Sequence, residues 1–211
     1  MSDTTPGTDT GPGTTWTSPT TLADLLGGDQ VMDIGIRALW TPAPRVAGPA
    51  FTVRCPPGDN LMLHAAIYRA EPGSVIVVES GDLTRALAGG NVMRIAQRRG
   101  VAGFVLDGTV RDIAEAREAG FGVYGRGVVP IPGDKGVVAP LNEPVRVGGV
   151  TVHPGDVVVA DEEGIVVVPG DKAPSVFADA AAKQAKEQAQ TLEEWEAAHR
   201  AKIEALLAGR R

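Results

Sequence analysis

The chain has 211 residues, a net charge of −6 and an isoelectric point near 5.1, and 43% of its residues are hydrophobic. This size and composition predict a single soluble globular domain, and an acidic chain without clustered Lys and Arg is poorly suited to binding nucleic-acid phosphates. The single cysteine, Cys55, excludes an internal disulfide and a zinc site built from several cysteines, so we expect a structural thiol. No apolar run reaches the ~20 residues of a membrane span, and no signal-peptide pattern is present. We therefore expect a cytoplasmic protein that binds neither nucleic acid nor membrane.

The first 18 residues are mostly Thr, Gly, Pro, Ser and Asp, a composition that cannot bury enough apolar surface to offset the cost of ordering. We predict a disordered tail over residues 1–18, in which Trp16 is the one side chain expected to pack onto the body. A short helix is predicted over 21–26, with a Thr or Ser cap before it.

Strands and helices then alternate through the first half of the chain. Apolar runs predict strands over 50–54, 74–78, 103–107 and 122–124. Helical spacing and Gly stop signals predict helices over 60–70, 89–99 and 111–119. This alternation favours a layered α/β protein.

The second half changes to short β segments separated by turns, and Gly148-Gly149 between alternating residues predicts a hairpin. The last part of the chain, 171–207, predicts one long helix with a thin apolar face, which indicates packing on a neighbouring subunit or extension into solvent rather than burial in one core. The predicted organisation is a tail over 1–18, an α/β domain over 19–170 and a C-terminal helix over 171–211. The predicted fold class is a layered α/β sandwich with a mixed sheet.

Gly89 and Gly90 open a predicted helix and are followed by Asn91 and Val92. A Gly-Gly turn that feeds a helix leaves backbone N–H groups free, and such groups can seat a carboxylate or phosphate. We therefore predict that these four residues bind substrate, with the N–H groups of Asn91 and Val92 as the donors.

Arg111, Asp112 and Glu115 crowd the start of the next predicted helix, directly after a strand. Asp112 and Glu115 are three residues apart, so both carboxylates can address one cation, and such hard oxygen ligands suit Mg²⁺ or Mn²⁺. Arg111 beside them can hold an oxyanion through its planar guanidinium. Acidic residues in a first helical turn are also common as simple caps, so spacing alone leaves both roles open.

The three histidines, His64, His153 and His199, lie far apart without metal-ligand spacing. We expect His64 to be a packed residue rather than a catalytic base, and the other two to be solvated. The sequence contains no phosphate loop or dinucleotide-binding fingerprint, and no Ser-His-Asp set can be assembled from it.

Five stretches resemble one protein family almost end to end, over about residues 20–190. They are residues 48–53, 72–78, 103–112, 147–156 and 160–169. Together they resemble the family shared by 4-hydroxy-4-methyl-2-oxoglutarate aldolases and the regulator of ribonuclease activity A. The resemblance implies an α-β-β-α sandwich of the swivelling-domain type, assembled as a homotrimer or a dimer of trimers (a homohexamer) with active sites between subunits.

The aldolase members of this family are divalent-metal pyruvate aldolases, and many also decarboxylate oxaloacetate. Their signature is Asp, twenty intervening residues, Arg-Asp, two residues, then Glu or Asp; its second part matches Arg111, Asp112 and Glu115. The resemblance implies that Asp112 binds Mg²⁺ or Mn²⁺, that Glu115 binds it directly or through water, and that Arg111 stabilises the substrate's 2-oxo group. It also implies that Glu187, in an Ala-Lys-Glu stretch of the C-terminal helix, reaches a neighbour's catalytic site.

One position departs from the signature, because Gly90 stands where the aldolases carry Asp. The ribonuclease regulator also lacks an acid there, but it lacks the Asp of the Arg-Asp pair as well, so this sequence falls between the two patterns. Asp82 and Asp107 are the acids that could take the place of the missing carboxylate. We predict a metal-dependent lyase that releases pyruvate from a 4-hydroxy-2-oxo acid. A non-enzymatic protein-binding trimer and a lyase for a different 2-oxo acid remain the alternatives.

Overall fold

The computed structural model describes residues 16–209. Most of the predicted tail, residues 1–15, lies outside the described residues. Trp16 packs onto the body as predicted: its indole N–H donates to Asp161 at 3.4 Å, and the Arg45 guanidinium lies 5.4 Å from its ring centre.

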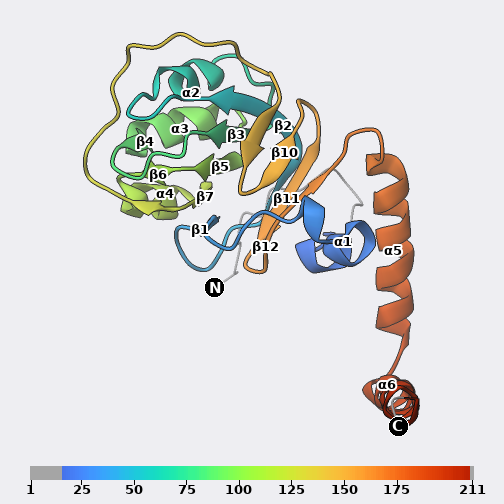
Figure 1. Cartoon of the computed structure of the whole chain (residues 1–211). Coiled ribbons are helices and arrows are strands. Elements are labelled where there is room, and N and C mark those ends of the chain that lie inside the picture. The colour runs from blue at the N-terminus through green and yellow to red at the C-terminus, as the bar shows by residue number, and fades with distance from the viewer. Residues whose placement is uncertain (1–15, 210–211) are drawn as a thin grey trace.

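A mixed seven-stranded sheet forms the centre of the fold, as predicted (Figure 1). Strands β2, β3, β5 and β7 run parallel to one another, whereas β1, β11 and β12 pair antiparallel with their neighbours. In spatial order the strands are β1 (Arg37–Ala38), β7 (Gly122–Gly125), β5 (Gly103–Asp107), β3 (Val75–Glu79), β2 (Val46–Arg54), β11 (Val157–Asp161) and β12 (Gly164–Val168).

One face of the parallel strands is covered by three helices, α2 (Leu61–Ala66), α3 (Gly90–Arg98) and α4 (Ile113–Ala119), which lie together in Figure 1. Alternate residues of the strands point toward them, because side chains alternate across a strand. Phe104 of β5, for example, packs edge-to-face on Phe121 at 4.9 Å within a core that includes Leu63 and Met93.

The opposite face of the sheet carries a second apolar cluster, which is closed by the hairpin β9 (Val145–Val147) and β10 (Val150–Val152). The predicted turn of this hairpin is confirmed: Gly148 and Gly149 both have positive φ, 55° and 82°, which residues with side chains rarely adopt. Val75, Val77 and Val105 fill this cluster from the sheet. The sheet is therefore buried on both faces.

A separate three-stranded parallel sheet holds β4 (Ala86–Ala88), β6 (Thr109–Val110) and β8 (Gly127–Val128). The sequence did not predict these strands, because two or three residues are too few to show a period of two. They position the candidate site.

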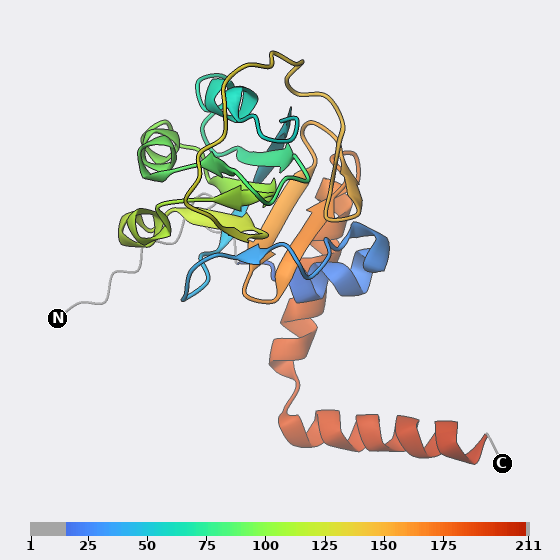
Figure 2. The same ribbon diagram turned by 60° about the vertical axis from the view of Figure 1, so that its left-hand side comes forward.

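The prediction of one long C-terminal helix is wrong. The chain forms α5 (Ala173–Ala189) and α6 (Leu192–Ala208), which turn sharply against one another in Figure 2. Helix α6 has its own N-cap, because the Thr191 hydroxyl accepts from the Glu194 N–H and the Glu194 carboxylate accepts from the Thr191 N–H.

The beginning of α5 packs on its own chain. Val176 and Ala180 are buried against Leu22 of α1 (Pro19–Leu26) and Val168 of β12, and a short 3-10 turn, η1 (Gly28–Gln30), follows α1. Helix α6 has no buried residue. Among the described residues, no helix is both long and apolar enough to cross a membrane.

Candidate functional site

Two loops that the sequence singled out meet at one edge of the small sheet. Strands β4 and β6 are parallel and pair Ala88 with Val110, so the segments that follow the two strands leave the same end of the sheet in the same direction. The Arg111 N–H donates to the Ala88 carbonyl oxygen at 2.9 Å. This bond places Gly89, which follows β4, beside Arg111, which follows β6.

Asp112 turns its carboxylate back across this junction. Its φ is +59°, in the left-handed region that Asp tolerates better than most residues, so Asp112 stands at the N-cap of α4 and not inside the helix. Oδ2 accepts the Gly90 N–H at 3.1 Å and lies 3.5 Å from Nε of Arg111. Oδ1 has no partner among the described residues.

The glycines at positions 89 and 90 make room for these side chains. A Cβ on Gly89 would lie 2.6 Å from Asp112 Oδ2 and 2.9 Å from Arg111 Nε. A Cβ on Gly90 would overlap the Glu115 carboxylate. Both carboxylates of the predicted metal site therefore lie against the Gly-Gly backbone, and Glu115 occupies the space that a side chain at position 90 would need.

The hydrogen bonds of α3 leave only one of the two predicted amide donors, Asn91 and Val92, free for a ligand. The Val92 N–H donates to the Gly89 carbonyl at 3.0 Å, and the Gly90 N–H goes to Asp112. The Asn91 N–H has no acceptor among the described residues, so it is the amide left to bind a ligand.

A pocket of about 90 Å³ opens at this junction. The predicted residues that line it are Gly89, Gly90, Asn91, Val92, Arg111 and Asp112. Glu115 is not part of the lining; it forms an ion pair with Arg94 at 3.6 Å. Three further polar residues line the same pocket, Asn60, His64 and Lys135, and the sequence did not mark them as site residues.

Asn60 is 3% exposed. Its Nδ2 donates to the Ala86 carbonyl at 3.2 Å, but its Oδ1 is buried without a hydrogen-bond partner among the described residues. An unsatisfied buried acceptor destabilises a protein by about 1–3 kcal/mol, so we expect a ligand or a water molecule to donate a hydrogen bond to this atom.

His64 was expected to be a packed residue, and it is half-buried in the pocket wall. Burial lowers its pKa, and the nearby Lys135 ammonium lowers it further, although a hydrogen bond to Leu87 opposes both. The imidazole is therefore neutral at pH 7.

Lys135 reaches the pocket on the long segment that precedes β9, and a buried aspartate holds this segment in place. Asp59, 6% exposed, accepts the N–H groups of Gly136 at 2.6 Å and Val137 at 3.1 Å through Oδ2, and that of Leu61 at 2.8 Å through Oδ1. Burial raises the pKa of Asp59, but these three N–H groups and the Lys135 charge outweigh it and hold the pKa below its ordinary value. Asp59 thus remains ionised and clamps the loop to the start of α2.

The donor set fits a divalent cation of the hard type. No group of three or more His, Cys, Asp or Glu side chains in residues 16–209 is arranged to hold a metal. Mg²⁺ commonly binds through only one or two protein carboxylates and keeps several waters. Asp112, with Oδ1 free beside the pocket, meets that requirement, and Glu115 stands on the other side of Gly90.

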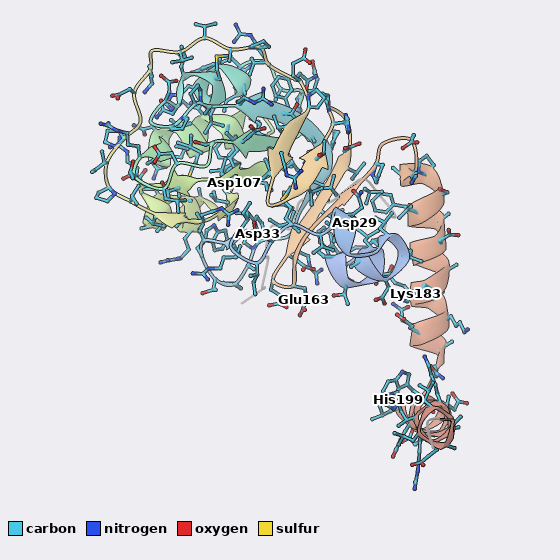
Figure 3. The ribbon with its side chains drawn as sticks, viewed as in Figure 1. Asp29, Asp33, Asp107, Glu163, Lys183 and His199 are labelled. Carbon is cyan, nitrogen blue, oxygen red and sulfur yellow. The ribbon has the colours of Figure 1, made fainter. Side chains whose placement is uncertain are left out.

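Asp82 and Asp107 do not replace the missing carboxylate at position 90. Asp82 caps a turn by accepting from Thr84 and from the Gly58 N–H, each at 2.8 Å. Asp107 pairs with Arg126 at 2.5 Å, and Arg126 also pairs with Asp33 at 2.7 Å; Asp33 and Asp107 lie near one another in Figure 3. The carboxylates of Asp82, Asp107 and Asp33 are therefore occupied by structural contacts.

Glu187 does not reach the pocket of its own chain. It lies on α5, across the sheet from α3 and α4 in Figures 1 and 2, and pairs with Lys183 at 3.8 Å. His199, labelled in Figure 3, stacks on Trp195 at 4.6 Å on exposed α6.

A second hollow, of about 970 Å³, includes Asp29, His153 and Asp156 in its lining. The buried Asp156 carboxylate is already occupied, because it accepts the N–H groups of His153 at 2.7 Å and Gly170 at 2.9 Å. Cys55 is buried, as expected, and burial raises the pKa of its thiol to about 11, so it is not a nucleophile at neutral pH.

The fold and this junction define a mixed α/β protein with a small polar pocket at the ends of two parallel strands. A family model described as RraA-like, Aldolase/RraA, matches residues 19–167. The chain belongs to this family, as its sequence predicted.

Proteins named as aldolases and proteins named as RraA inhibitors are both similar to this chain. A protein of Halalkalibacterium halodurans named "Putative 4-hydroxy-4-methyl-2-oxoglutarate aldolase" is 39% identical over 175 residues, which cover 82% of this chain and 83% of that one. The structure of the RNA-processing inhibitor RraA from Thermus thermophilis has a TM-score of 0.66 and 32% identity, and covers 74% of this chain and 93% of its own. Streptomyces coelicolor RraAS2, described as an unusual member of the RNase ES inhibitor RraA family, has a TM-score of 0.72 and 32% identity, with 81% and 89% covered.

Proposed function

We propose that this protein is a divalent-metal-dependent aldolase that releases pyruvate from a 4-hydroxy-2-oxo acid such as 4-hydroxy-4-methyl-2-oxoglutarate. The observation that carries the proposal is the meeting of Arg111, Asp112 and the free Asn91 N–H at one pocket edge. The name of the Halalkalibacterium relative supports it. Decarboxylation of oxaloacetate, which also yields the enolate of pyruvate, belongs to the same proposal.

The chain's own residues bind and orient the substrate. The Asn91 N–H binds the substrate carboxylate, and the Arg111 guanidinium lies beside the 2-oxo oxygen. Asp112 would hold Mg²⁺ or Mn²⁺, with Glu115 as a direct or water-mediated partner, and the ion would supply Lewis-acid polarisation of the 2-oxo group.

In the cleavage step the C3–C4 bond breaks and its electron pair stays on C3, in the fragment that carries the 2-oxo group. The C4 hydroxyl passes its proton to solvent water as C4 becomes a carbonyl carbon, and C3 later takes up a proton from water, so that 4-hydroxy-4-methyl-2-oxoglutarate yields two molecules of pyruvate. Negative charge thus develops on the oxygen next to Arg111, where a fixed cation stabilises it most.

Replacing Arg111 by Ala tests this assignment. We expect kcat/KM for pyruvate release from 4-hydroxy-4-methyl-2-oxoglutarate to fall about 100-fold, because the cation beside the developing enolate is lost. Arg117→Ala on the exposed face of α4 is the matched control and should keep the wild-type rate. A loss shared equally by both variants would count against the role of Arg111.

The second candidate is a non-enzymatic binding protein. It is favoured by the absence of an acid at position 90 and by the ion pair that Glu115 makes with Arg94. Calorimetry separates the two: an aldolase binds Mn²⁺ in a manner that Asp112→Asn weakens, whereas a pure regulator shows no binding that depends on Asp112. The third candidate is a lyase for another 2-oxo acid, whose substrate would use the room left by Gly90.

We further propose that the protein assembles as a homotrimer or a dimer of trimers, in which Glu187 reaches a neighbour's pocket. The exposed end of the chain supports this. Helix α6 exposes five large apolar side chains and has no buried residue, whereas most helical stability in proteins comes from packing of an apolar face. These side chains are Leu192, Trp195, Ile203, Leu206 and Leu207.

A further inference from the structure

Three polar residues of the pocket take no part in the proposed chemistry. Asn60, His64 and Lys135 line it, but none belongs to the Arg-Asp-x-x-Glu stretch. They come from the start of α2 and from the segment before β9, whereas Arg111 and Asp112 come from the ends of the small sheet. The pocket therefore has a second wall of its own.

Lys135 supplies a cation to this wall, and its charge also acts on the neighbouring Asp59 carboxylate. In the part of the chain that the structure describes, its ammonium forms no ion pair, whereas Arg111 is paired with Asp112. Its backbone is fixed, because Asp59 clamps the next two residues and the N–H of Asn60 donates to the Asp134 carbonyl at 2.8 Å. The buried Asp59 carboxylate thus fixes the backbone that places the exposed Lys135 side chain at the pocket.

Asn60 supplies the second observation. Its Oδ1 is buried and unpartnered in the same wall, so a ligand that fits here offers a hydrogen-bond donor as well as a negative charge. A hydroxyl next to a carboxylate has this combination. His64 stays neutral, and because one ring nitrogen bonds to the Leu87 backbone, the other can bond to a ligand without adding charge.

We propose that Lys135 and Asn60 form a distal subsite, in which Lys135 binds the second carboxylate of the substrate and Asn60 Oδ1 accepts the hydrogen bond of its C4 hydroxyl. The inference rests on the proposed function. It makes Lys135 the residue that distinguishes a 2-oxo diacid from pyruvate, since pyruvate has no distal carboxylate.

The test measures the affinity of two ligands by calorimetry with Mg²⁺ present: pyruvate, and 2-oxoglutarate, which has the distal carboxylate but no C4 hydroxyl and is not cleaved. Lys135→Met should weaken the binding of 2-oxoglutarate about tenfold or more, because a charge-assisted contact is lost. Its pyruvate affinity should stay within about twofold of the wild type. Lys135→Arg should restore most of the loss, and Lys202→Met on α6 is the matched lysine control.

Lys135 is exposed, so the variant is expected to fold, and its melting temperature checks this. The subsite is overturned when Lys135→Met leaves 2-oxoglutarate affinity unchanged, or when it weakens both ligands equally. It is also overturned when the wild type binds 2-oxoglutarate no more tightly than pyruvate. Selective, Lys135-dependent binding without cleavage of 4-hydroxy-4-methyl-2-oxoglutarate would uphold the subsite and reject the aldolase.

Substitutions of Asn60 test its part in the subsite separately from that of Lys135. Asn60→Asp keeps the shape of the side chain but places a negative charge beside the ligand, so it should weaken 2-oxoglutarate binding more than pyruvate binding. With 4-hydroxy-4-methyl-2-oxoglutarate, Asn60→Ser should raise KM more than it lowers kcat, because the contact is made in the ground state as well as in the transition state. A purely structural Asn60 would change the melting temperature and leave the ratio of the two affinities unaltered.

Discussion

Asp112→Asn is expected to lower kcat/KM for metal-dependent pyruvate release by about 10²–10³-fold, which corresponds to about 3–4 kcal/mol of transition-state stabilisation. The variant removes the negative charge that would hold the cation and keeps the oxygen that accepts the Gly90 N–H. Asn also tolerates the left-handed backbone at this position, where φ is +59°, so the fold should persist.

Two measurements accompany this prediction. The melting temperature of Asp112→Asn should remain close to that of the wild type, and its apparent affinity for Mn²⁺ should fall together with the rate. Glu118→Gln, an exposed charge change on the same helix, is the matched control. A turnover within about threefold of the wild type would show that Asp112 is only a helix cap.

Asp59→Asn is expected to destabilise the protein by about 2–4 kcal/mol at pH 7. The carboxylate accepts three backbone N–H groups, and an amide nitrogen in place of one oxygen would face donors with a donor. The loop that carries Lys135 would then be released, so the variant should also bind 2-oxoglutarate less tightly. Urea denaturation gives the free energy of unfolding, and Asp134→Asn, at an exposed carboxylate in the same loop, is the control.

The pH dependence of this effect has a definite sign. The folded-state pKa of Asp59 is lowered, so its contribution to stability is fully present above the unfolded value, near pH 4, and is lost as the pH falls through the folded value. The difference between the wild type and Asp59→Asn should therefore be constant near neutrality and shrink below about pH 4. A difference that grows in acid would contradict the clamp.

Local pattern was sufficient to predict much of the fold. The apolar runs predicted the parallel strands β2, β3, β5 and β7, because strands buried on both faces are continuously apolar. The Gly148-Gly149 turn and the junction at Arg111 were also correctly placed. The break at Thr191 was missed although its signal was present, since Thr191 and Glu194 have the spacing of a capping box.

The second wall of the pocket could not be predicted from local pattern. Asn60 and Lys135 are 75 positions apart in the sequence. They meet only because the backbone of the segment before β9 pairs with that before α2, through an isolated β-bridge between Asp59 and Asp134. The strands β4 and β6 that bring Gly89 to Arg111 are too short to leave a periodic signal. The sequence therefore predicted one wall of the pocket, and the structure added the other.

Aldolase activity is tested by pyruvate release from 4-hydroxy-4-methyl-2-oxoglutarate by the wild-type protein, coupled to lactate dehydrogenase, with Mg²⁺ or Mn²⁺ and with chelator. We expect release that depends on the metal, stops with chelator and returns when the metal is restored. Release no faster than that of the metal alone would contradict the aldolase assignment and direct attention to other oxo acids or to protein partners.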